Sequence, residues 1–220
     1  MRLKSNIAIL CLLTCAIFAD SRGLAEPGYR EIQTIAQKPD LSQAIVTERD
    51  LPPGFKESSP AELAQTKKDL SSEGVAVEIE SVFELKNFLK GDITQLQSIM
   101  GYTTLVPGFM SENYVRHDAK NLMRGLIREM ENVPREIRGL NLGTLQPQPL
   151  TNLDGIGDVS AGITTSLNIM GFRMRMDMVV FQRGRVVGKV MVHYLDSSRP
   201  GVSAADIARK LDSRIVQLAR

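Results

Sequence analysis

The sequence has 220 residues, of which 27 are Lys or Arg and 25 are Asp or Glu. The first 25 residues contain three basic side chains (Arg2, Lys4 and Arg22) and one acidic side chain (Asp20), so the rest of the chain has 24 of each and no net charge. A chain without an excess of cations lacks the attraction for phosphate backbones that dominates nucleic-acid binding, which argues against nucleic acid as a partner.

The first 25 residues have the layout of an export signal. Two basic residues precede an apolar run from Ile7 to Phe18, and small residues follow it. The run is too short to span a bilayer core of about 30 Å. We therefore expect a signal peptide over residues 1–25, cleaved after Ala25 or, less favourably, after Ala19. The mature protein is then secreted or periplasmic.

Both cysteines, Cys11 and Cys15, lie in this segment. Cleavage after residue 25 would leave a chain with no disulfide, no thiolate nucleophile and no cysteine ligand for a metal. The segment Leu12-Leu13-Thr14-Cys15 resembles the lipobox of bacterial lipoproteins, although Thr14 stands where those sequences usually have Gly, Ala or Ser. The resemblance implies, as the alternative, a lipid anchor at Cys15. We expect no other attachment to a membrane.

Residues 26–43 are polar, contain three Gly or Pro residues and show no sustained period, which predicts a flexible arm. Residues 44–220 are interpreted as a single domain. Its first helix is expected over 60–71, since Ser59 can cap it and Glu62 can complete a capping box.

Two strands are expected next, over 75–85 and 94–104. In the first, Ile79, Phe83 and Leu85 alternate with polar residues that include Glu84.

A long helix is expected over 112–131, because apolar residues recur there at three- and four-residue spacings. Leu122, Leu126 and Met130 should form its buried face. A loop over 135–158 is expected to follow.

The last third predicts three consecutive strands with alternating apolar residues, separated by short turns, and then a helix that begins after Ser203. The apolar stripe of this helix is Ile207, Leu211, Ile215 and Leu218.

Together these elements predict an α+β fold. Its antiparallel sheet would end in a C-terminal meander and be covered on one face by the long central helix and the C-terminal helix. The alternative is two small subdomains divided near residue 105.

The hairpin before the last helix allows a specific register to be predicted. If the apolar faces of its two strands coincide, a three-residue loop over 182–184 pairs Met176 with Val190 and Met174 with Val192. The same register places Asp177 opposite Lys189. Gly184 should then have a positive φ.

Two segments resemble parts of exported bacterial lipoproteins and periplasmic α+β domains of unknown function. The first is Asp-Leu-Pro-Pro-Gly-Phe at 50–55. The second is Val-Val-Phe-Gln-Arg-Gly-Arg-Val-Val at 179–187, followed by a strand and the helix at 204–218. The resemblance implies an α+β domain at the cell surface or in the periplasm. It supplies no catalytic residue that could be transferred to this chain.

The residue types that usually carry chemistry are isolated in this sequence. His117 and His193 have no second ligand at metal-binding spacing, and His193 is expected on the polar face of its strand. The segment Asp154-Gly155-Ile156-Gly157-Asp158 is interpreted as a turn rather than a cation loop. The alternating methionines at 174, 176 and 178 are interpreted as core. We therefore predict no catalytic, metal-binding or cofactor-binding residue, and no cofactor.

These observations favour an exported, non-enzymatic binding or interaction module of the cell envelope. Its expected partner is an apolar ligand or another envelope protein. The alternative is a secreted hydrolase with carboxylates brought together from distant segments, for example Asp154, Asp158 and Glu112.

Overall fold

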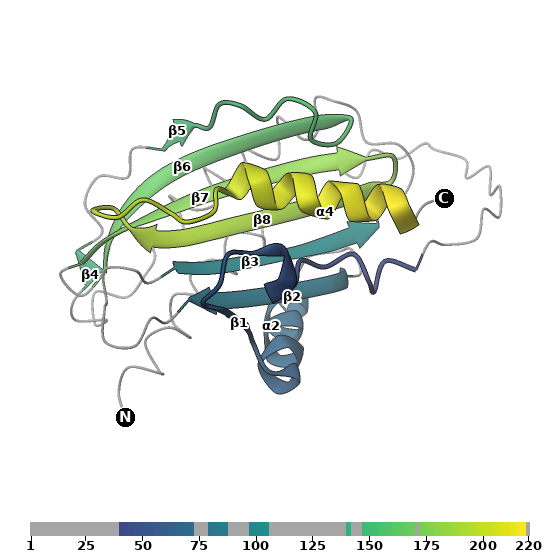
Figure 1. Cartoon of the computed structure of the whole chain (residues 1–220), viewed down its shortest axis with the longest axis horizontal. Coiled ribbons are helices and arrows are strands. Elements are labelled where there is room, and N and C mark those ends of the chain that lie inside the picture. Colours follow the sequence, from purple (N-terminus) through teal and green to yellow (C-terminus); the bar gives the residue numbers. More distant parts are fainter. Residues whose placement is uncertain are drawn as a thin grey trace.

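The structure, a computed structural model, describes residues 40–72, 79–87, 97–105, 140–141, 147–169 and 172–218. Its main feature is one curved antiparallel sheet with a helix lying across it (Figure 1). The strands are β1 (Phe55–Glu57), β2 (Ile79–Asn87), β3 (Gln97–Leu105), β4 (Leu140–Asn141), β5 (Gln148–Pro149), β6 (Val159–Ile169), β7 (Phe172–Arg183) and β8 (Val186–Leu195). The helices are η3 (Glu48–Asp50), α2 (Pro60–Ser72) and α4 (Ala204–Leu218).

The sheet has the strand order β1-β2-β3-β8-β7-β6-β4, and β5 also pairs with β6. The predicted C-terminal meander is confirmed as β6-β7-β8. β3 pairs with β8 from Gln97 opposite Tyr194 to Leu105 opposite Val186. Strands before and after residue 105 therefore belong to one sheet.

α4 covers one face of this sheet, above β7 and β8 (Figure 1). Ser203 caps it as expected, since its Oγ accepts the Asp206 backbone N–H at 3.1 Å and donates to the Asp206 carboxylate at 2.7 Å. Ile207, Leu211 and Ile215 are fully buried, which confirms three positions of the predicted stripe. The prediction for the fourth position was wrong, since Leu218, the last residue of the helix, is 37% exposed.

The methionines of β7 face the other side of the sheet. Met178 is paired with Met191 of β8, and Met191 with Met100 of β3, so these three form a row across the strands. All three are buried, although none belongs to the core beneath α4. β7 and β8 are thus buried on both faces. The predicted helix over 112–131 lies outside the described residues.

The predicted register of the β7–β8 hairpin was wrong. Met176 is opposite His193 and Asp177 opposite Val192, with a two-residue turn at Gly184-Arg185. The prediction assumed that only one face of each strand is buried. Because both faces of β7 and β8 are buried, the alternation of apolar residues does not determine how the two strands pair. The positive φ at Gly184 is confirmed, at 56°. A glycine with positive φ at the first turn position is typical of a type II′ hairpin.

β2 keeps the predicted alternation for Phe83 and Leu85, which join the core beneath α4. A bulge between Ile79 and Ser81 shifts the pairing by one residue, so that Ile79 faces the opposite side. Glu84, expected on a solvated face, is only 3% exposed. It accepts a hydrogen bond from Ser58 Oγ at 2.8 Å, and its other oxygen lies 3.0 Å from the Lys86 ammonium.

The N-terminal part of the described chain is packed. α2 spans Pro60–Ser72, in agreement with the expected helix over 60–71, and Ser59 and Glu62 form the predicted capping box. Leu41, at a position expected in the arm over 26–43, is fully buried in the core, whereas Ser42 and Gln43 are exposed. The expected signal peptide lies outside the described residues. Within those residues, neither α2 nor α4 has the length and apolar character needed to span a bilayer.

Candidate functional site

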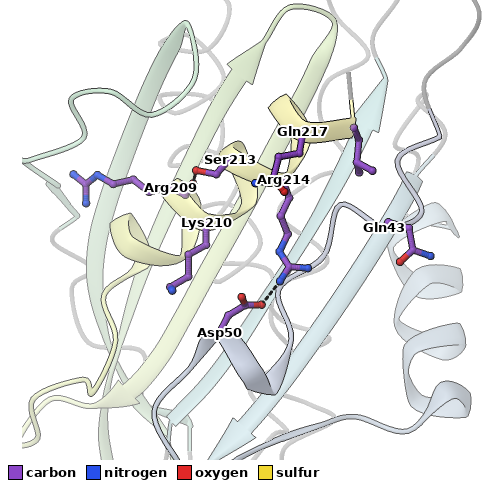
Figure 2. A pocket seen from close by; sticks show the side chains of 8 residues that line it. Gln43, Asp50, Arg209, Lys210, Ser213, Arg214 and Gln217 are labelled. Carbon is purple, nitrogen blue, oxygen red and sulfur yellow. Dashed lines mark hydrogen bonds and ion pairs between the residues drawn. The ribbon is translucent and has the colours of Figure 1, made fainter. Parts of the chain in front are cut away.

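An open groove of about 610 Å³ runs between the outer face of α4 and the segment that carries Gln43 and Asp50 (Figure 2). Long polar side chains dominate its wall. The lining residues are Gln43, Asp50, Arg209, Lys210, Ser213, Arg214, Gln217 and Leu218. Three of them are cations and one is an anion, so the groove is locally basic in a protein whose expected mature chain is neutral.

The helical period explains why these side chains gather. Ile207, Leu211 and Ile215 direct one face of α4 into the core. Lys210 and Arg214 therefore fall outside this buried face, one turn apart, with Lys210 exposed and Arg214 half-buried at its edge. Arg209, Ser213 and Gln217 extend the same polar surface along the helix.

The other wall is fixed by local hydrogen bonds. Ala44 is buried, and its carbonyl accepts a hydrogen bond from Ser81 Oγ at 2.8 Å, which ties this segment to β2. Thr47 and Asp50 form a capping box around η3. Asp50 Oδ2 accepts hydrogen bonds from the Thr47 backbone N–H at 2.8 Å and from the Thr47 hydroxyl at 3.0 Å. The Asp50 carboxylate is therefore held in one position at the edge of the groove.

Asp50 and Arg214 join the two walls. Arg214 Nη2 donates to Asp50 Oδ2 at 2.6 Å (Figure 2). Partial burial by itself raises the pKa of Asp50, but the hydrogen bonds from Thr47 and Arg214 outweigh it and lower that pKa below its ordinary value. Asp50 is thus ionised at neutral pH and already bound to one of the three cations.

The other two cations differ in the hydrogen bonds and ion pairs that they make. Arg209 donates to the Asn152 carbonyl at 2.6 Å and to Asp206 Oδ1 at 3.2 Å. Lys210 makes no hydrogen bond or ion pair within the part of the chain that the structure describes. Lys210 is therefore the groove cation best able to take up an anionic group.

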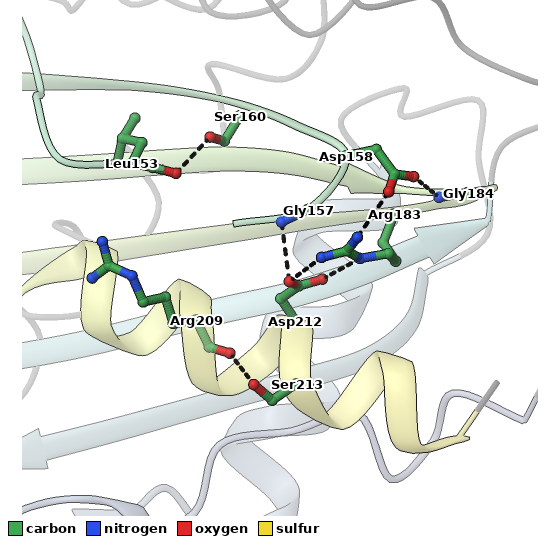
Figure 3. Close-up of polar contacts among 9 residues, drawn as sticks. All are labelled: Leu153, Gly157, Asp158, Ser160, Arg183, Gly184, Arg209, Asp212 and Ser213. Carbon is green, nitrogen blue, oxygen red and sulfur yellow. Dashed lines mark hydrogen bonds and ion pairs between the residues drawn. The ribbon is translucent and has the colours of Figure 1, made fainter. Parts of the chain in front are cut away.

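A second polar cluster fixes α4 to the sheet (Figure 3). Arg183, at the end of β7, donates from Nε and Nη2 to the two oxygens of Asp212, at 2.9 and 2.6 Å. Its Nη1 donates to Asp158 at 2.8 Å, and Asp158 also accepts the Gly184 backbone N–H at 2.7 Å. The hydrogen bond to Asp212 is the largest effect that raises the pKa of Arg183 above its ordinary value.

This cluster also shows what the carboxylates of residues 154–158 do. The segment is a turn, as predicted, and both Gly155 and Gly157 have positive φ. Asp158 is engaged by Arg183 and Gly184, whereas Asp154 is exposed. Glu112, the third carboxylate considered for hydrolysis, lies outside the described residues, as does His117. Among the residues that are described, no group of three His, Cys, Asp or Glu side chains could hold a metal ion.

His193 is not on a solvated face as expected. Only 3% of it is exposed, and its cross-strand neighbours are Ser98 and Met176. Its Nε2 is buried and has no hydrogen-bond partner among the residues that the structure describes. Burial lowers the pKa of His193 from 6.5 to about 4, and the negative charge of Glu84 offsets this only in part. The imidazole is therefore neutral at pH 7, and it does not line the groove.

No protein-family model matches this chain, and no curated protein or solved structure matches it either. The resemblance to exported α+β domains remains a prediction.

Sequence reasoning named none of the groove residues as a site. The signal available to it was the presence of three cations on the polar side of the final helix, at positions 209, 210 and 214. Such a run is usually only a solvated helix face. What makes this face one wall of a groove is the contact of Arg214 with Asp50, which lies 164 residues away in the sequence.

Proposed function

We propose that this protein is an exported, non-enzymatic binding module of the cell envelope, and that the groove along α4 is its binding site. The observation that carries the proposal is the groove itself: an open space of about 610 Å³ lined by amide, hydroxyl and cationic groups. Volumes of this order accommodate small ligands or a projecting group of a larger partner.

The lining supports binding rather than catalysis. Hydrolysis needs a nucleophile with a base, or two carboxylates, within hydrogen-bond reach of the reacting atoms. Among the described residues that line the groove, the one carboxylate is Asp50, which is bound to Arg214. In the same set the one hydroxyl is Ser213, which donates to the Arg209 carbonyl at 2.8 Å, and there is no histidine to activate it. These groups can donate hydrogen bonds and stabilise negative charge.

The lining also bears on the chemistry of the ligand. Leu218 is the single apolar residue among the eight described residues that line the groove. A polar ligand, or the polar group of an envelope protein, fits this surface better than the apolar ligand expected from the sequence.

The proposed location rests on residues 1–25. Mass spectrometry of the protein recovered from the cell envelope tests it directly. A mature chain beginning at Glu26 supports export, and an acylated chain beginning at Cys15 supports a lipid-anchored form. An intact N-terminus on the functional protein would contradict both.

Filling the groove tests the proposed site. Ser213→Trp places a large ring on the exposed face of α4, and Lys68→Trp adds the same ring to the exposed face of α2 as a matched control. Fractionated envelope lipids, glycans and peptides would be screened by thermal shift. We expect stabilising components to act on the wild type and on Lys68→Trp, and to lose their effect on Ser213→Trp. Equal effects on all three proteins would place binding elsewhere.

A further inference from the structure

We propose that the groove binds a phosphate group, held by Lys210 and Arg214 in competition with Asp50. This inference rests on the proposed binding function and specifies the ligand for the same groove. The shared chemistry is a phosphate monoester, which either a soluble metabolite or a lipid headgroup could present.

The placement of the two cations carries the inference. Lys210 and Arg214 are four residues apart on α4, so they project from neighbouring turns of one face. Both extend from the helix toward the wall that carries Asp50 (Figure 2). A tetrahedral phosphate between them could accept from both at once, whereas either cation alone would hold it weakly.

The Asp50–Arg214 pair shows that an oxyanion already occupies part of this position. Arg214 contacts Asp50 through Nη2 at 2.6 Å. A guanidinium has five N–H donors in a planar fork, so one contact leaves further donors for a second oxyanion. Asp50 therefore shows that Arg214 can bind an oxyanion at this position. Its negative charge also repels an incoming anion.

Charge favours phosphate over carboxylate as the ligand group. Lys210, Arg214 and Asp50 together have a formal charge of +1. A phosphate monoester carries a charge of about −1.5 to −2 at pH 7 and three strong acceptor oxygens. It gains more from the two cations than a carboxylate with one charge and two oxygens. The amides of Gln43 and Gln217, which also line the groove, can donate to the remaining oxygens.

Three single substitutions separate this proposal from general electrostatic attraction. Lys210→Ala removes the cation that has no partner among the described residues, and we expect it to weaken phosphate binding about tenfold, an amount typical of one charge-assisted contact. Asp50→Asn removes the competing charge but keeps an oxygen that can accept the hydrogen bonds from Thr47. We expect this variant to bind phosphate several-fold more tightly. Lys68→Ala removes an equal charge from α2 and should change nothing.

Binding would be measured on the mature chain by two arms at one fixed salt concentration. In the first, inorganic phosphate and glycerol phosphate are titrated and followed by amide chemical shifts. In the second, vesicles that contain phosphatidic acid, whose headgroup is a phosphate monoester, are compared with vesicles of phosphatidylcholine by co-sedimentation. Circular dichroism on each variant confirms that it is folded.

Saturable binding of the soluble probes, in the order Asp50→Asn, wild type, Lys210→Ala, supports a soluble phosphate ligand. The same order seen only with phosphatidic acid vesicles supports a lipid headgroup. The proposal is overturned if neither probe binds. It is also overturned if Lys68→Ala weakens binding as much as Lys210→Ala, or if Asp50→Asn does not strengthen it. A phosphate-free component that Ser213→Trp no longer binds would leave the binding function standing while removing phosphate as its ligand.

Discussion

Asp212 is expected to be the most important carboxylate of α4 for stability. It accepts two hydrogen bonds from Arg183 and the backbone N–H of Gly157 at 3.0 Å, and its side chain is only 7% exposed. Asp212→Ala would leave the Gly157 donor without an acceptor, at a cost of about 1–3 kcal/mol. It would also remove a bidentate partner of Arg183, which adds about 1.5–3 kcal/mol for hydrogen bonds to a charged group.

Part of that loss should be recovered. The Arg183 side chain is 31% exposed and keeps its contact with Asp158 at 2.8 Å, so water and Asp158 continue to stabilise its charge. Breaking a fully buried ion pair costs about 3–5 kcal/mol. We therefore expect Asp212→Ala to lower the free energy of unfolding by about 3 kcal/mol, at the low end of that range.

Asp206 supplies the matched control because it is a carboxylate on the same helix with a side chain that is 58% exposed. Asp206→Ala removes the reciprocal cap with Ser203 and the pair with Arg209, worth about 1 kcal/mol together. Urea unfolding followed by circular dichroism gives both values. A loss at Asp212 no larger than the loss at Asp206 would refute the importance assigned to the cluster.

A double-mutant cycle with Arg183→Met and Asp212→Leu isolates the pair itself. If the ion pair is the cause, the double variant should be more stable than the sum of the single losses predicts, by about 2 kcal/mol. Strict additivity would show that the two side chains stabilise the hairpin and the helix independently.

Two further predictions concern the sheet. Gly188→Ala should lower the free energy of unfolding by about 2 kcal/mol, because the added Cβ would lie 2.4 Å from Cζ of Phe181. At Gly184 an added Cβ has open space, so Gly184→Ala should cost only about 1 kcal/mol, through the φ of +56°. Thermal unfolding should therefore show the larger loss of stability for Gly188→Ala. Burial lowers the pKa of His193 from 6.5 to about 4, so between these pH values the unfolded chain binds more protons than the folded chain. The free energy of unfolding should therefore fall as the pH is lowered through this window, by at most about 1.4 kcal/mol per pH unit. His193→Gln should remove this contribution in unfolding experiments at several pH values, and an unchanged slope would contradict it.

Local features of this protein could be read from the sequence because they depend on neighbouring residues. The starts of α2 and α4 follow from Ser59 and Ser203, whose hydroxyls satisfy nearby backbone donors in any tertiary context. The positive φ at Gly184 follows from the absence of a Cβ in a tight turn.

The candidate site could be anticipated only in part. The cations at 209, 210 and 214 are visible in the sequence, and the apolar stripe of α4 predicts that they face away from the core. Their role as one wall of a groove depends on Asp50, which is brought to Arg214 by the packing of a segment near the N-terminus. No local pattern relates two residues so far apart.

The sequence by itself determined where most described strands and helices lie and that β6, β7 and β8 form a meander. The tertiary structure alone decided the hairpin register, the side of the sheet that α4 covers and the burial of His193 and Glu84. The physical reason is that β7 and β8, and β2 around Glu84, are buried on both faces. Apolar alternation identifies a buried face only where the other face is in water, and here both faces exclude it.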